Sequence, residues 1–290
     1  MNILRRGNRT ILGAFGDTHG GHILGLLNPE TKLKTGEGGY KTPQLNQPQE
    51  YLWEIYTKHI KQLMEFADGD DICLLHMGDV TQGKVFGTQL VSTKTSDQFS
   101  IAYYNFVPWL EHKNVKYLRM VIGTSVHIFG EGTSEDIIEE RIKSSYPNIN
   151  IRSMYHSLLD YKGVTIDYSH HGPSSGIRNW LKGNEARYYM RSLMWDELAC
   201  GNKPPHIIMR GHYHTSVKEY LSIRFDGKEY ESWLYVLPSY CMMDEYAIKS
   251  TKSQFQITNG MIAIEIKDGK LGKPLQLLDS LDVRTKEKIE

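Results

Sequence analysis

Five short apolar runs along this 290-residue chain each end beside glycine and beside aspartate, threonine or histidine. The five segments read GDTHGGH at 16–22, MGDVTQG at 77–83, VIGTSVH at 121–127, SHHGP at 169–173 and RGHYH at 210–214. Short apolar runs bounded by turn residues predict buried β-strands. In open α/β sheets the ligand crevice lies outside the carboxyl ends of the strands, so we expect these polar residues to gather at one edge.

The stretches between the runs predict helices. Apolar residues at three- and four-residue spacing within 50–67 mark one face of an amphipathic helix. A second helix is expected within 98–112 and a third over 133–146, with Thr133 as its N-cap. A further helix is expected over 184–199.

The second half of the chain predicts hairpins instead. Lys-Gly at 162–163 and Asp-Gly at 226–227 and 268–269 are typical of tight turns between paired strands. Strands therefore alternate with helices early and pair with each other late, which predicts an α/β fold of mixed α+β character. We expect a single domain over 1–290, with 28–49 as a loop insert and 279–290 as a frayed tail.

The amino-acid composition limits the classes of protein to which this chain can belong. Lys plus Arg and Asp plus Glu each number 34, so the net charge does not by itself indicate a partner of strong charge. The three cysteines are scattered, which argues against a disulfide framework. We see no signal peptide and no apolar stretch long enough to span a membrane, and therefore expect a cytoplasmic protein without a membrane partner.

The spacing of the polar residues suits metal ions. Residues two apart in an extended segment point to the same side, so Asp17 can act with His19 and His212 with His214. Asp79 has two carboxylate oxygens and could bridge two cations. Imidazole and carboxylate together suit Mn, Fe, Zn or Ni. Two such ions about 3.5–4 Å apart can clamp a phosphoryl group.

The five segments, in this order, resemble the calcineurin-like metallophosphoesterase family over residues 11–215. The resemblance implies two packed mixed sheets flanked by helices, an αββα sandwich, with two divalent metal ions at one edge, of which Mn²⁺ is favoured over Zn, Fe or Ni. It also implies ligand roles. Asp17, His19 and His214 resemble the ligands of the first metal, Asp79 the bridge and His212 a ligand of the second metal.

Two adjacent histidines compete for one further ligand role. His171 fits the His-x-Pro pattern of some family members, because Pro173 lies two residues further on. We therefore assign the metal to His171 and keep His170 as the alternative.

One segment departs from the family pattern. The family usually has Gly-Asn-His, whereas this chain has Gly123-Thr124-Ser125-Val126-His127, a variant that resembles phage-encoded members. In one reading Thr124 is a weak ligand of the second metal and His127 is the acid that protonates the leaving oxygen. In the other reading His127 is itself the ligand. Either way, Asp79 and His127 are the residues we expect to carry the chemistry.

The resemblance implies a phosphoesterase in which a hydroxide between the metals attacks phosphorus. We expect phosphodiester substrates, with nucleic acid as a candidate partner. The alternatives are a phosphomonoesterase or small-nucleotide hydrolase, and a metal-binding scaffold without catalysis. Three arginines could bind phosphate or could simply form a solvated helix face: Arg178, Arg187 and Arg191. The sequence leaves the oligomeric state open.

Overall fold

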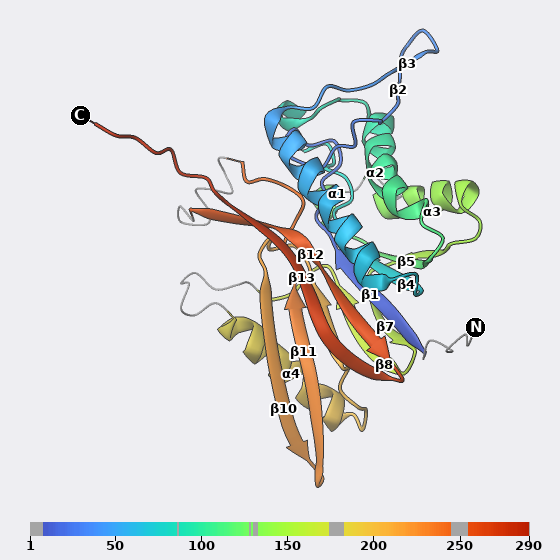
Figure 1. Cartoon of the computed structure of the whole chain (residues 1–290). Coiled ribbons are helices and arrows are strands. Elements are labelled where there is room, and N and C mark those ends of the chain that lie inside the picture. The colour runs from blue at the N-terminus through green and yellow to red at the C-terminus, as the bar shows by residue number, and fades with distance from the viewer. Residues whose placement is uncertain are drawn as a thin grey trace, which may run out of the picture.

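The computed structural model describes residues 8–85, 87–127, 129, 133–173, 183–244 and 255–289. Two large sheets dominate it (Figure 1). The first sheet has six strands: β1 (Arg9–Phe15), β4 (Ile72–His76), β5 (Val115–Val121), β6 (Asn150–Met154), β12 (Gln256–Lys267) and β13 (Lys270–Asp282). Their order is β13-β12-β1-β4-β5-β6, in which β1, β4, β5 and β6 are parallel to one another.

The second sheet has five strands and a parallel centre. Its strands are β7 (His156–Tyr161), β8 (Val164–Ser169), β9 (Ile207–Arg210), β10 (Val217–Phe225) and β11 (Lys228–Val236). Their order is β10-β11-β9-β8-β7, with β8, β9 and β11 parallel. The carboxyl ends of β8 and β9 therefore lie next to each other.

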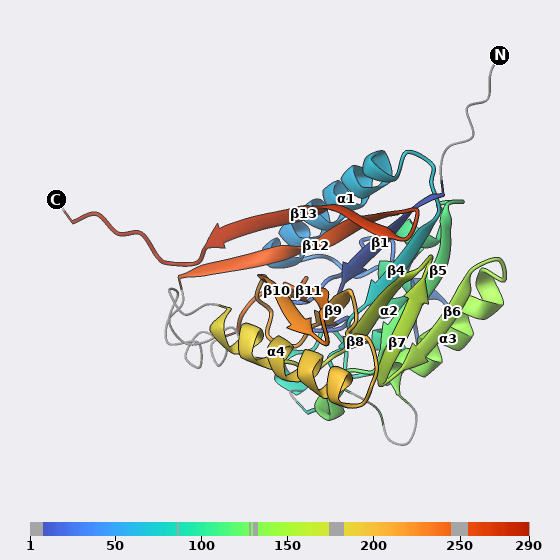
Figure 2. The same cartoon turned by 90° about the horizontal axis from the view of Figure 1, so that it is seen from below.

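Helices cover the outer faces of the two sheets. The α-helices of the described residues are α1 (Gln47–Ala67), α2 (Thr95–Leu110), α3 (Ser134–Ser145) and α4 (Asn184–Ala199), and two short 3-10 helices, η1 (Gly87–Gln89) and η2 (Ser125–His127), lie in loops. The first three pack on the six-stranded sheet and α4 packs on the five-stranded sheet, so that α1 and α4 lie on opposite outer sides (Figure 2). Across the described ranges, no helix has both the length and the apolar character that a membrane crossing requires.

The alternation of side chains along β1 shows how the layers form. Leu12 and Ala14 point into the core between the two sheets, which is completed from the second sheet by Ile166 and Met209. Ile11 and Phe15 point the other way, into the core beneath the helices. Both faces of β1 are thus buried, which is why its sequence is an unbroken apolar run.

The predicted fold class is confirmed: the chain is a mixed α/β protein with two packed sheets between helices. The predicted helices and hairpins appear close to their expected positions. Thr133 caps α3, because its hydroxyl accepts a hydrogen bond from the backbone N–H of Asp136 at 3.2 Å.

Two expectations about loops need correction. The 28–49 segment is not wholly a surface loop: it contains a small hairpin of β2 (Leu33–Lys34) and β3 (Tyr40–Lys41), and α1 already begins at Gln47. Leu33 is buried against Ile101 of α2. The predicted frayed tail was also placed too early, because β13 continues to Asp282.

Candidate metal centre

The five loops named by the sequence all follow strands with parallel neighbours. Asp17 and His19 follow β1, Asp79 follows β4, and Thr124 and His127 follow β5 of the first sheet. His170 and His171 follow β8 and His212 and His214 follow β9 of the second sheet. The structure brings all of these side chains except that of Thr124 together into four overlapping groups that could hold a metal ion. The expected convergence at one edge is therefore observed.

The backbone is unusual at five of these residues. They have left-handed φ angles: Asp17 (49°), His19 (43°), Asp79 (52°), His212 (72°) and His214 (49°). Residues other than glycine seldom adopt this region, and outliers of this kind gather at functional sites.

Asp17, His19 and His214 form the first group. Nε2 of His19 lies 3.2 Å from Nε2 of His214, and Nε2 of His214 lies 3.4 Å from Oδ1 of Asp17. Asp17 is fully buried, and its Oδ1 has no hydrogen-bond partner among the residues that the structure describes. A buried carboxylate oxygen beside two converging imidazole nitrogens fits a cation, which would satisfy all three atoms.

Asp79 belongs to two of the groups. Its Oδ2 lies 3.1 Å from Nε2 of His170, 3.8 Å from Nε2 of His127 and 4.0 Å from Nε2 of His19. Burial by itself would raise the pKa of Asp79, but the hydrogen bond and the charge of His170 outweigh it and lower the pKa. Asp79 is therefore an ionised carboxylate between two sets of histidines, which is the position expected of a bridging ligand.

The loop after β5 leaves no room for a side chain beside Asp79. A Cβ at Gly123 would lie 2.0 Å from Oδ1 of Asp79 and 2.4 Å from its backbone nitrogen. The next residue, Thr124, donates its backbone N–H to that same Oδ1 at 2.7 Å. Glycine is thus required at 123 so that the backbone can approach and orient the carboxylate.

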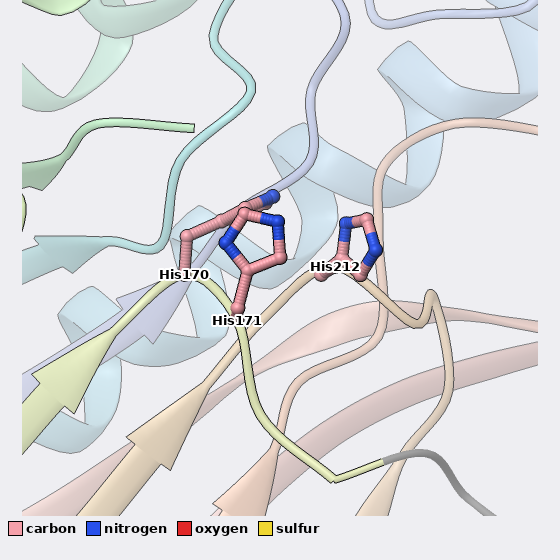
Figure 3. A group of neighbouring side chains, drawn as sticks. All are labelled: His170, His171 and His212. Carbon is pink, nitrogen blue, oxygen red and sulfur yellow. The ribbon is translucent and has the colours of Figure 1, made fainter. Parts of the chain in front are cut away.

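The second group contains His170, His171 and His212 (Figure 3). The Thr124 hydroxyl faces the same space, 3.1 Å from Nε2 of His170 and 3.2 Å from Nδ1 of His212. His170 is buried whereas His171 is exposed. Both histidines that competed for one ligand role are thus present in the group, and His170 is the one whose Nε2 reaches Asp79.

Three of the histidines have a fixed tautomer. Nδ1 of His170 donates to the carbonyl of Met77 at 2.5 Å, and Nδ1 of His127 donates to the carbonyl of Gln82 at 2.6 Å. Nδ1 of His19 lies 2.9 Å from the side-chain oxygen of Gln82. An Nδ1 that holds a proton leaves Nε2 as the atom that can bind a metal, as is usual for histidine ligands. Burial alone would lower the pKa of His170, but its hydrogen bond to Asp79 and the charge of Asp17 raise the pKa to about 9, so a cation here would have to displace a proton from Nε2. Burial also lowers the pKa of His19 to about 3, which keeps its imidazole neutral.

Sequence reasoning missed two residues that support the centre. Gln82 belongs to the quoted segment MGDVTQG, three residues after Asp79, but only the folded chain shows that it contacts both His19 and His127. Glu135 at the start of α3 is 1% exposed and accepts the backbone N–H of Gly123 at 3.4 Å. Burial raises the pKa of Glu135 to about 7, and the charge of Asp79 also acts to raise it. No pattern in the sequence singled this glutamate out.

The predicted phosphate-binding arginines are not gathered at the centre by any described contact. Arg187 on α4 is 57% exposed and forms an ion pair with Glu219 of β10, with 2.7 Å between Nη2 and Oε2. Arg191 is exposed on the same helix. Arg178 lies outside the described residues. A substrate-binding role for these arginines stays a prediction.

Comparisons with known proteins give a limited result. No family model matches the chain, and no curated protein matches it. Among solved structures it is similar to a 5'-nucleotidase precursor from Thermus thermophilus (12% identity, 94% of this chain and 54% of that one, TM-score 0.38). It is also similar to the NAD nucleotidase of Haemophilus influenzae (11% identity, 94% and 50%, TM-score 0.37) and to a metallophosphoesterase from Sphaerobacter thermophilus (10% identity, 94% and 89%, TM-score 0.31). The chain spans about half the length of the first two proteins. At these identities and TM-scores the similarity assigns no function, so the function has to be inferred from the site itself.

Proposed function

We propose that this chain is a metal-dependent phosphoesterase with a binuclear centre, and that it hydrolyses phosphodiester bonds. The observation that carries the proposal is the position of Asp79, an ionised and buried carboxylate between the His19 side and the His170 side of the site. Two divalent cations bound on these two sides would activate water at neutral pH and stabilise both the attacking and the leaving oxygen. Mn²⁺ is the metal we favour, with Zn, Fe or Ni as alternatives.

In this proposal the residues of the site have separate roles in metal binding and in proton transfer. Asp17, His19 and His214 hold the first cation, and His170 and His212 hold the second, with Asp79 shared between them. His127 is suited to a proton transfer, because Nδ1 is held by the Gln82 carbonyl and Nε2 faces the centre. In its protonated form Nε2 would donate to the leaving oxygen.

The test compares an aryl phosphodiester with the corresponding monoester, using metal-stripped protein to which Mn²⁺ is added back. We expect Mn²⁺-dependent cleavage of the diester, and DNA, RNA and cyclic nucleotides are then tried as substrates. Cleavage of the monoester alone would instead support a phosphomonoesterase. Bound metal without turnover on either substrate would favour a metal-binding scaffold.

Asp79→Asn supplies the variant that links activity to the site. It removes one charge and one metal-binding oxygen with little change in shape, so turnover should fall to the background rate while the fold is retained. Asp226→Asn is the matched control, because Asp226 also has a left-handed φ (48°) but lies in the turn between β10 and β11. Full activity in Asp79→Asn would contradict the proposed mechanism.

A further inference from the structure

The His170 side of the site contains three imidazoles, whereas the proposed function assigns only those of His170 and His212 to the second cation. His170 and His171 leave the end of β8 and His212 leaves the end of the neighbouring strand β9 (Figure 3). Their ring centroids are 4.9 Å (His170–His171), 4.6 Å (His171–His212) and 5.1 Å (His170–His212) apart. One nitrogen from each ring lies within 4.8 Å of a nitrogen of the other two, so the three can meet around one ion.

Two of these histidines are firmly held. His170 is fixed from both ring nitrogens, by the Met77 carbonyl at Nδ1 and by Asp79 at Nε2. The loop that carries His212 is held by its own backbone N–H, which donates to Oδ2 of Asp17 at 3.2 Å. The third, His171, is exposed. It can therefore turn towards an ion without disturbing the core.

The oxygen donor on this side is weak. Thr124 presents a neutral hydroxyl 3.3 Å from Oδ2 of Asp79, at the position where an amide oxygen would be a stronger ligand. An ion here would otherwise depend on two imidazoles and a shared carboxylate. An additional imidazole would compensate for the weak hydroxyl.

We propose that His170, His171 and His212 together bind the second metal ion, with His171 replacing the oxygen ligand that Thr124 does not supply. This inference rests on the proposed binuclear function and defines the chemistry of its second position. The two positions then differ in their ligands. The first has two imidazoles and the carboxylate of Asp17, whereas the second has three imidazoles, and both share Asp79.

Ligand type predicts different metal preferences at the two positions. Imidazole suits Zn, Fe, Cu and Ni, whereas carboxylate and other oxygen ligands suit Mn, Mg and Ca. The position with three imidazoles should therefore favour Zn²⁺ over Mn²⁺ more strongly than the position that contains Asp17. A preparation supplied with both metals should bind Zn²⁺ preferentially at the second position.

The test is a calorimetric titration of the metal-stripped 290-residue chain with Zn²⁺, and separately with Mn²⁺. The wild type should bind two ions of each metal. His171→Ala should weaken one of the two Zn²⁺ sites at least about tenfold, leave the other unchanged, and weaken Mn²⁺ binding less. His112→Ala is the matched control, because His112 is also an exposed histidine but follows α2 at a distance in sequence from every ligand group. It should bind both ions as the wild type does.

A rescue variant separates loss of a ligand from a general disturbance. Thr124→Asn in the His171→Ala background supplies an amide oxygen to the same position, so it should restore most of the lost Zn²⁺ affinity. Unchanged Zn²⁺ binding in His171→Ala would overturn this inference, as would a loss at the second site in His127→Ala but not in His171→Ala. If the wild type itself binds no metal and hydrolyses no phosphoester, the proposed function fails as well. If the wild type does both while His171→Ala binds like wild type, only the role of His171 is lost.

Discussion

The side-chain oxygen of Gln82 lies 2.9 Å from Nδ1 of His19. The backbone carbonyl of the same glutamine accepts the proton of Nδ1 of His127. Gln82 thus orients two histidines, one before and one after Asp79 in the sequence. In both cases the contact is made at Nδ1, which leaves Nε2 facing the metal centre.

Replacing Gln82 with methionine should weaken metal binding at the first position. Methionine keeps the length of the side chain but cannot accept the His19 proton, and loss of a partner of this kind commonly costs about 10- to 100-fold in metal affinity. Zn²⁺ titration of metal-stripped protein measures the change. Gln89→Met is the matched control, because Gln89 contacts His22, which belongs to none of the ligand groups. Equal binding by Gln82→Met and wild type would show that His19 needs no such support.

Gly123→Ala should damage the centre through Asp79. The added methyl group would meet Oδ1 of Asp79 at 2.0 Å, so the carboxylate or the loop has to move. We expect loss of metal at both positions, since Asp79 is shared, and loss of all metal-dependent turnover. Metal content after dialysis measures the effect. Gly36→Ala should bind metal normally, because a Cβ at Gly36 meets nothing within 4 Å, and normal binding by Gly123→Ala as well would contradict the shared role of Asp79.

Glu135 should make stability depend on pH. Its pKa is raised from 4.5 to about 7 because the carboxyl is buried, so the folded protein holds this proton more tightly than the unfolded chain does. The resulting stabilisation is complete below pH 4.5 and is lost as the pH rises through about 7. Glu135→Gln cannot ionise. The difference between the free energy of unfolding of Glu135→Gln and that of wild type should therefore rise between pH 4.5 and about 7, by up to about 3 kcal/mol.

Urea unfolding of metal-stripped protein at several pH values tests this expectation. Glu140→Gln is the matched control, since Glu140 lies on the same helix but its side chain is 74% exposed. That variant should follow the pH dependence of wild type. A Glu135→Gln curve parallel to the wild-type curve from pH 4.5 to about 7 would show that Glu135 does not titrate in the folded protein over this range.

Arg210 and Arg187 should differ sharply in their contribution to stability. Arg210 is fully buried and pairs with Asp167, with Tyr189 also bonded to its guanidinium. Arg210→Met would leave the Asp167 carboxylate with the exposed imidazole of His156, 2.8 Å away, as its remaining side-chain partner among the described residues, and removing one member of a buried pair costs about 3–5 kcal/mol. Arg187→Met removes a guanidinium that is 57% exposed from its pair with the half-buried Glu219 and should cost about 1 kcal/mol or less. Urea unfolding of both variants checks the difference, and similar losses would contradict it.

The sequence was most informative where a strand ended in a turn. Short continuous apolar runs such as that of β4 are typical of buried strands, so the loops after them could be located. The five loops lie close to one another because β1 and β8 have parallel neighbours, so that the carboxyl ends of these strands meet at the same edge. Thr133 was likewise recognisable as a cap from local residues alone.

Features that depend on contacts between distant segments could not be predicted in this way. The strand β6, with the sequence NIRSM, has little apolar pattern and forms because β5 offers it a parallel edge. Asp279 lies in the segment predicted as a frayed tail, but its carboxylate bonds His59 of α1 at 2.7 Å and it belongs to β13. The partners that fix the histidine tautomers are also remote in sequence, with Met77 and His170 as one example.

The left-handed backbone at five metal-site residues has a consequence for evolution and engineering. At such positions glycine, or often asparagine, is the conformationally preferred residue, whereas Asp17, His19, Asp79, His212 and His214 are suited to chemistry instead. Glycine at 214 would relieve the strain of the left-handed backbone, but it would also remove a ligand and the imidazole that lies 3.4 Å from Oδ1 of the buried Asp17. A selection for an unstrained backbone alone would tend to erase this site, and the persistence of all five residues in one chain would then require selection for what they bind.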